Sequence, residues 1–136
     1  MTRSRIFLPS AMPSFQFMEQ RRRGYGFERL DVYWIAMEHY ELAKKIAASL
    51  PPESTDDANQ YRRAAKSIVR NICEGAGEFR RPEKARFYRM ALRSGEECGG
   101  IIGMLISDFG ERDAFNQADA LLTRIIPMLV KLCKAQ

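Results

Sequence analysis

Ten basic side chains between Asn59 and Arg93 are the residues of this chain with the clearest capacity for chemistry. The same stretch holds three acidic residues, so it carries +7, whereas the whole 136-residue chain carries +5. Arginine outnumbers lysine there, and a planar guanidinium pairs well with phosphate oxygens. We therefore predict binding to the backbone of RNA or DNA. The residues predicted to contact phosphate are Arg62, Arg63, Lys66, Arg70, Arg86, Arg89 and Arg93. The alternative is a solvated helix face whose charges pair locally or with a neighbouring subunit.

Signals for catalysis are weak. His39 is the single histidine of the chain, which disfavours a multi-histidine metal site and histidine-assisted nucleophiles. Glu96 and Glu97 are adjacent, and adjacent helical residues diverge rather than share a proton. The glycines of Gly75-Ala76-Gly77 neither follow a strand nor precede a P-loop lysine, so a nucleotide loop is not supported. We expect a protein that is not an enzyme and uses no metal or cofactor.

The cysteines indicate the compartment. Cys73, Cys98 and Cys133 are odd in number and lack CxxC or zinc-type spacing. We interpret them as reduced residues in or beside a core, which is typical of a reducing compartment. An apolar N-terminal segment at 6–8 is broken at once by Pro9, which argues against a signal peptide. We expect a cytoplasmic protein with no membrane partner, since no apolar run approaches the ~18 residues that span a bilayer.

Four helices must position these side chains. Prolines and glycines punctuate an otherwise helical pattern, which predicts helices over about 30–50, 55–77, 82–109 and 113 to near the C-terminus. We divide the chain into a basic, flexible N-terminal tail at 1–26 and a bundle domain at 27–136. Short connections favour an all-α, antiparallel, up-down-up-down four-helix bundle.

Two features of the helix faces extend this prediction. Ser67, Asn71 and Glu74 form a polar strip beside an apolar stripe, a pattern typical of hydrogen bonds between helices. The first helix is apolar around more than half of its circumference. The third helix carries a second apolar ridge that we place away from the core and assign to a subunit interface: Met90, Ile101 and Met104. This surplus favours a homo-oligomer, although a tight small core also explains wide apolar stripes.

The segment at 62–77 reads RRAAKSIVRNICEGAG and resembles the signature of the 23S rRNA intervening-sequence proteins. The opening FERLDVY at 27–33 is similar to the start of the first helix in that family. Phe87, Ala91 and Ser94 are similar to its third-helix pattern. The resemblance covers about residues 27 to 135. Arg93 stands where the family often has glycine, and Gly95, Gly99 and Gly100 are additional, so the third helix departs from the pattern.

The resemblance implies a small, cytoplasmic, bacterial four-helix bundle that assembles as a ring-like homopentamer. Some members are encoded within insertions in ribosomal RNA genes, and a related accessory protein of diversity-generating retroelements binds nucleic acid and a reverse transcriptase. It implies no enzymatic activity. Residues of this chain that match the family pattern are interpreted as packing and polar-network residues: Ser67, Asn71, Glu74, Gly75, Gly77, Ser94 and Glu97.

The combined prediction is a non-enzymatic homo-oligomer that binds RNA or DNA through a basic surface on its second and third helices. The alternative function is a scaffold or adaptor that binds a protein partner through exposed apolar ridges. Salt separates the two, because phosphate binding weakens steeply as salt rises and apolar docking does not.

Overall fold

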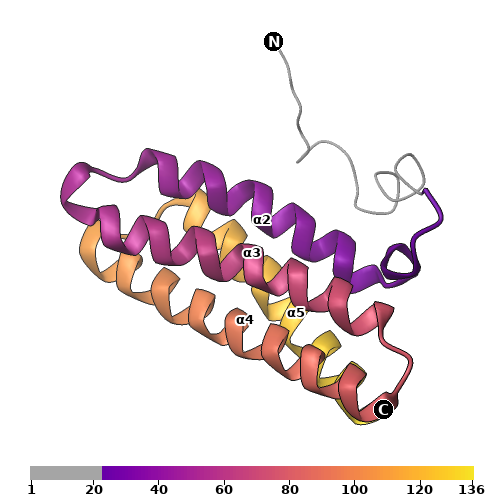
Figure 1. The fold of residues 1–136 in the computed structure, drawn as a ribbon. Coiled ribbons are helices and arrows are strands. Elements are labelled where there is room, and N and C mark those ends of the chain that lie inside the picture. Colours follow the sequence, from indigo (N-terminus) through magenta and orange to yellow (C-terminus); the bar gives the residue numbers. More distant parts are fainter. Residues whose placement is uncertain (1–22) are drawn as a thin grey trace.

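The computed structural model describes residues 23–136, and these form helices with no strand (Figure 1). The elements in chain order are η1 (Gly26–Arg29), α2 (Asp31–Ser49), η2 (Pro52–Ser54), α3 (Thr55–Gly77), α4 (Arg81–Phe109) and α5 (Asp113–Ala135). The all-α class and the four long helices are confirmed. Most of the predicted tail, residues 1–22, lies outside the described residues. Among residues 23–136, no helix is both long enough and apolar enough to cross a membrane.

The helix ends follow from proline and glycine chemistry at most positions. Pro51 follows α2, and Pro82 occupies the first turn of α4, where its missing N–H costs nothing. Gly110 ends α4 with a φ of +81°, a left-handed conformation that glycine adopts without strain. The end of α3 differs, because the chain leaves Gly77 in an extended conformation at Glu78 and no left-handed glycine is used.

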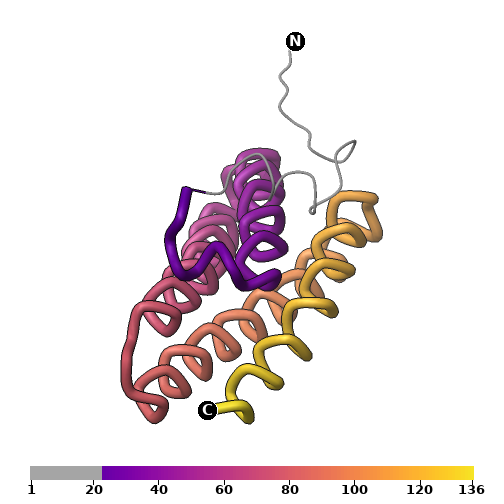
Figure 2. Tube along the Cα trace, turned by 90° about the vertical axis from the view of Figure 1, so that its right-hand side faces the viewer, coloured from indigo at the N-terminus to yellow at the C-terminus, as the bar shows by residue number. Residues whose placement is uncertain are grey.

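Each long helix packs on two others: α2 and α4 each lie against both α3 and α5. The connections from α2 to α3 and from α4 to α5 lie at one end of the bundle (Figure 1). At the other end, Figures 1 and 2 both place the C-terminal end of α5 near the connection from α3 to α4. The core runs between the helices, and its largest fully buried side chains include Tyr61, Phe115, Ile68 and Leu129.

The wide apolar face of α2 is covered within the chain. The five residues Val32–Ala36 are all buried, because η1, α3 and α5 surround the first turns of α2. Trp34 donates its indole N–H to the carbonyl oxygen of Glu28 in η1 at 3.0 Å. The breadth of this stripe therefore reflects a tight small core, and it does not support a subunit interface.

Ile101 requires a correction. The sequence analysis placed it with Met90 and Met104 on an apolar ridge away from the core, but it is only 6% exposed and belongs to the core cluster. The reason is helical spacing, since Cys98, Ile101, Ile102 and Leu105 form an i, i+3, i+4, i+7 set. Met90 and Met104 are 38% and 50% exposed and do lie outside the core.

We expect Gly75→Ala to destabilise the fold and Gly77→Ala to leave it nearly unchanged. A Cβ on Gly75 would stand 2.6 Å from Cε1 of Tyr88, so the aromatic ring or the α3–α4 spacing must shift, whereas Gly77 faces open space. Overpacking of this kind costs about 1–3 kcal/mol. Urea unfolding followed by circular dichroism measures both variants. Equal stability of the two would show that Gly75 does not set the approach of α3 to α4.

Candidate nucleic-acid interface

The four predicted phosphate contacts on α3 lie on its solvent face. Arg62, Arg63, Lys66 and Arg70 are all exposed. Their spacing places Arg62, Lys66 and Arg70 in one row, four residues apart. None of the four forms an ion pair with any of the residues 23–136. The structure thus leaves a row of cationic side chains available to an anionic ligand.

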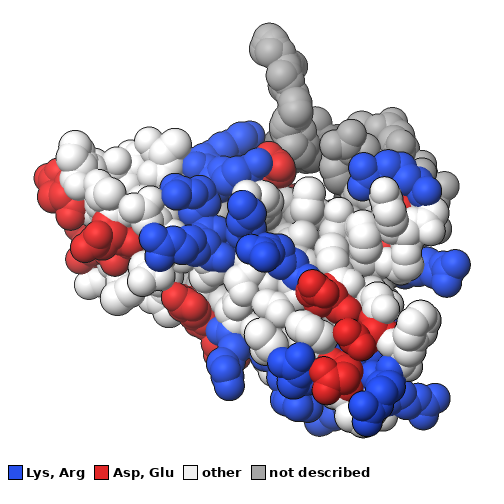
Figure 3. Space-filling view, viewed as in Figure 1, with Lys and Arg blue, Asp and Glu red and all other residues white. Residues whose placement is uncertain are grey.

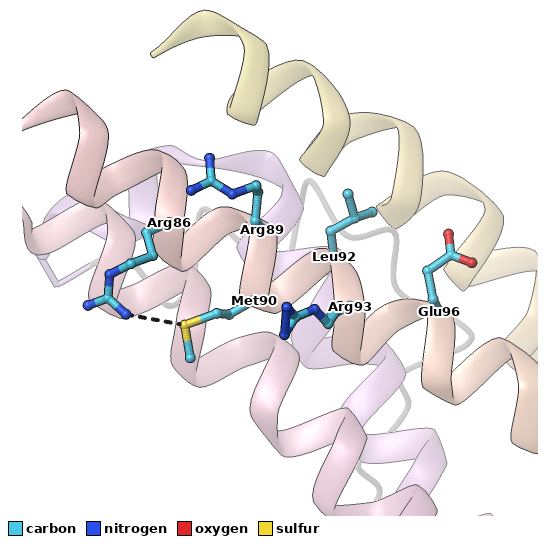
Figure 4. Close-up of a pocket in the computed structure, with 6 residues that line it drawn as sticks. All are labelled: Arg86, Arg89, Met90, Leu92, Arg93 and Glu96. Carbon is cyan, nitrogen blue, oxygen red and sulfur yellow. Dashed lines mark hydrogen bonds between the residues drawn. The ribbon is translucent and has the colours of Figure 1, made fainter.

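The three predicted contacts on α4 are exposed but less uniform. The Nε atom of Arg86 pairs with Oε1 of Glu83 at 3.1 Å, and its guanidinium lies 4.6 Å from the centre of the Phe87 ring. Arg86 also donates to Sδ of Met90 at 3.8 Å. Figure 4 shows Arg89 projecting toward α5, while Arg86 and Arg93 project to the other side of α4. Arg86 is therefore partly neutralised by its own helix.

On the face that Figure 3 shows, the basic side chains do not form one continuous surface. Figure 3 shows Lys and Arg gathering over α3 and the adjoining part of α2, and a second group near the connection from α3 to α4. Acidic side chains lie between the two groups (Figure 3). On this face, the basic side chains over α3 and those near the α3–α4 connection therefore do not merge into one patch.

Sequence reasoning did not include the α3–α4 connection among the site residues. Arg80 and Arg81 are exposed and form no ion pair within the described part of the chain. Phe79, which precedes them, is 97% exposed. The sequence does contain the pattern, an aromatic residue followed by two arginines between two helices. A connection has no helical period, however, from which the exposure of its side chains could be predicted.

The polar strip on α3 does join two helices. Ser94 of α4 donates its hydroxyl to Oγ of Ser67 on α3 at 2.8 Å. Asn71 donates its amide to both the carbonyl oxygen and Oγ of Ser67, at 2.9 and 3.0 Å. The bond from Ser94 to Ser67 therefore joins two helices, whereas the bonds of Asn71 stay within α3 and hold Ser67 in place; all three residues are partly buried.

Two members of the predicted network are not part of it. Glu74 and Glu97 are exposed, and neither forms a hydrogen bond or ion pair with the residues that the structure describes. Each lies three residues beyond a partly buried network member, Asn71 or Ser94, and is rotated about 60° from it around the helix, which is enough at the edge of the contact to place the side chain in solvent. Gly75 does pack closely between α3 and α4, whereas Gly77 packs against nothing.

The single histidine is a core residue. His39 on α2 is fully buried, and its Nε2 lies 2.9 Å from the hydroxyl oxygen of Tyr61 on α3. Its Nδ1 is buried without a hydrogen-bond partner among residues 23–136. Burial lowers the pKa of His39 to about 4 and raises the pKa of Tyr61 above its usual range. Both groups are neutral at pH 7, and the pair fastens α2 to α3.

The three cysteines are free thiols, as expected. Cys98 is fully buried, and Cys73 and Cys133 are half-buried. Burial, reinforced by neighbouring carboxylates, raises the pKa of Cys73 to about 11 and that of Cys98 to about 12. A thiol that is protonated at neutral pH is a poor nucleophile. These residues act as small apolar side chains.

The buried carboxylate of Glu28 holds the backbone of the residues that precede α2. Glu28 in η1 accepts hydrogen bonds from the backbone N–H groups of Arg23 and Tyr25 at 2.7 and 3.0 Å. Burial raises the pKa of Glu28, but these bonds and the Arg23 guanidinium together hold it below its usual value. The charge of Glu28 therefore stabilises the conformation of residues 23–28, which lead into α2.

Two shallow hollows open on the surface. One, of about 460 Å³, follows α4 and is lined by Arg86, Arg89, Met90, Leu92, Arg93 and Glu96 (Figure 4). The other, of about 510 Å³, lies between η1 and the end of α3, and Arg70 lines its edge. The first is an open surface along one helix that carries more positive than negative charge, which suits an extended anion.

A family model described as 23S rRNA-intervening sequence protein matches residues 28–131. No curated protein matches the chain at a significant level.

Proposed function

The chain belongs to the 23S rRNA-intervening sequence protein family, and from that premise we propose that it is a non-enzymatic, homo-oligomeric bundle that binds the backbone of RNA or DNA. The proposal includes an antiparallel up-down-up-down arrangement of the four helices. It also places the protein in the bacterial cytoplasm, where free thiols such as those of Cys73 and Cys133 remain reduced.

One observation carries the binding proposal: six of the seven predicted phosphate contacts are exposed and form no ion pair within residues 23–136. Solvated cations held on a rigid helix attract an anionic polymer at little ordering cost. Neutralising phosphates also releases condensed counterions, which drives association. Such contacts fix position and select sequence weakly.

Self-assembly is supported by the exposed face of α4 near Met104. Gly100 and Gly103 are exposed there, and a Cβ on either would meet no atom within 4 Å. Glycine inside a helix costs about 1 kcal/mol relative to alanine. A second helix approaching over these glycines, beside Met104, offsets that cost by close packing. The number five comes from the family resemblance alone.

The alternative function, a scaffold that binds a protein partner through apolar ridges, has less surface to use. With Ile101 buried, the predicted ridge reduces to Met90 and Met104, fourteen positions apart on α4. Two separated methionines form a small docking area compared with the cationic row on α3. The same face cannot both close an oligomer and hold a partner, so assembly through it excludes this alternative.

We expect the wild-type protein to bind labelled oligonucleotides of unrelated sequence with similar affinity, and to lose them as salt rises. Fluorescence anisotropy between about 25 and 200 mM salt gives the slope of log K against log salt, to which each phosphate contact adds about one unit. A flat salt response, or no binding at low salt, would contradict the proposed function.

Light scattering coupled to size exclusion tests the assembly in the same samples. We expect a mass that is a multiple of the 15.6 kDa chain. A stable monomer at micromolar concentration would contradict self-assembly and leave nucleic-acid binding to be judged by anisotropy alone.

A further inference from the structure

Phe79 is an exposed aromatic side chain, and none of the residues 23–136 forms a ring or cation contact with it. It is 97% exposed, the largest exposed fraction among the large apolar residues that the structure describes. It lies in the three-residue connection between the end of α3 at Gly77 and the start of α4 at Arg81. Because the ring is almost fully exposed, it contributes little to the stability of the fold.

Other aromatic rings near the surface are already engaged. Tyr25 stacks on Phe27 with ring centres 5.2 Å apart, and the guanidinium of Arg23 lies 5.4 Å from its ring centre. The ring of Phe87 is approached by Arg86 in the same way. Phe79 has no ring or cation partner among residues 23–136, so both of its faces are open to solvent.

Hydrogen bonds tie the connection that holds Phe79 to both flanking helices. Nζ of Lys84 donates to the carbonyl oxygens of Gly75 and Ala76 at 3.1 and 3.2 Å, which ties the first turn of α4 to the last turn of α3. The backbone N–H of Glu78 donates to the carbonyl oxygen of Gly75 at 3.3 Å. An aromatic ring on a hydrogen-bonded turn binds a planar ligand with less loss of backbone freedom than a ring on a free loop.

The charge beside Phe79 identifies the chemistry of that ligand. Arg80 and Arg81 follow it directly, both exposed and unpaired within the described chain. A planar apolar surface next to two guanidinium groups matches an unpaired nucleobase with its flanking phosphates. A duplex offers the phosphates but keeps its bases stacked inside, so it cannot use the ring.

We propose that Phe79, with Arg80 and Arg81, is a stacking site for an unpaired base of single-stranded RNA or DNA. This inference rests on the proposed function and adds to it a preference for single strands at the α3–α4 end of the bundle. The cationic row on α3 holds the backbone of either form, whereas Phe79 separates unpaired from paired nucleic acid.

The test compares three labelled probes by anisotropy with the full chain: a fifteen-residue oligothymidine, an abasic strand of equal length and charge, and a blunt duplex. One stacked base is worth a change in affinity of roughly fivefold to a hundredfold. We expect oligothymidine to bind more tightly than the abasic strand by about that factor. Phe79→Ala should remove the difference, and Phe79→Trp should retain it. Gln117→Ala, which shortens an exposed uncharged side chain on α5, is the control and should change nothing.

The outcomes separate this inference from the function on which it rests. If wild type binds oligothymidine and the abasic strand equally and both bindings weaken with salt, the proposed function stands. The stacking site at Phe79 is then contradicted. Unchanged base preference in Phe79→Ala also overturns it. If the protein binds none of the three probes, both the proposed function and the stacking site are contradicted. A change of oligomeric mass in Phe79→Ala would make Phe79 a subunit contact and likewise overturn the inference. Circular dichroism confirms that each variant is folded.

Discussion

Replacing Arg62, Lys66 and Arg70 by glutamine is expected to weaken binding of every oligonucleotide roughly a hundredfold at low salt. The three side chains are exposed, unpaired within residues 23–136 and aligned along α3. Each contributes about one unit to the slope of log K against log salt, so the slope should fall by about three. Anisotropy with two unrelated sequences measures both quantities. The helices should persist, since all three residues lie opposite the buried face of α3.

A second triple variant controls for net charge. Arg124, Lys131 and Lys134 on α5 are also exposed, and replacing them by glutamine removes the same total charge from a different helix. If binding depends on the row on α3, this control loses much less affinity. Equal losses in the two variants would show that overall charge governs association, and the α3 row would not be a binding surface.

The sequence was sufficient to locate the helices, because their signals are local. Apolar residues recur at helical spacing between prolines and glycines, and the predicted ranges agree with α2 to α5 within a few residues. Buried residues such as Tyr61, Ile68 and Ile72 share one face of α3 and reveal it by period alone. The exposed positions of the basic residues follow from the same period.

What the sequence missed depends on contacts between elements. The short helix η1 is held by hydrogen bonds to Glu28 and by packing on α2 and α3, and neither leaves a periodic trace. Ile101 is different, because its helical spacing with Cys98 and Leu105 is present in the sequence and indicates its burial. The separation of the basic residues into two groups depends on where acidic side chains fall in three dimensions (Figure 3).

For His39, the residue type alone did not indicate its structural role. As a lone histidine it was an unpromising catalyst, and the structure places it in the core with Tyr61. Its burial nevertheless lowers its pKa, which predicts a measurable pH dependence of stability. Burial favours the neutral imidazole. Burial also raises the pKa values of its partner Tyr61 and of Cys98, so both stay protonated in acid.

We expect the free energy of unfolding to fall by about 2–3 kcal/mol between pH 7 and about pH 4.5 because of His39. The unfolded chain takes up a proton at His39 near the ordinary pKa of 6.5, whereas the folded protein resists it until about pH 4. Stability is therefore full above pH 6.5 and declines as the pH falls toward 4. Glu28, whose pKa is held below its ordinary value of 4.5, adds its own loss only in more acidic solution. Urea unfolding at several pH values measures the slope.

The control removes both partners of the buried pair, since His39→Leu alone would leave the hydroxyl of Tyr61 without its hydrogen bond and cost about 1–3 kcal/mol at any pH. The double variant His39→Leu, Tyr61→Phe leaves no orphaned polar group and no titrating imidazole. We expect its stability at pH 7 to exceed that of the single variant and its curve between pH 7 and pH 4.5 to be flatter than that of wild type. If wild type and the double variant decline in parallel, other groups govern the acid response. His39 would then be protonated inside the fold, with its unpartnered Nδ1 as the site that takes the proton.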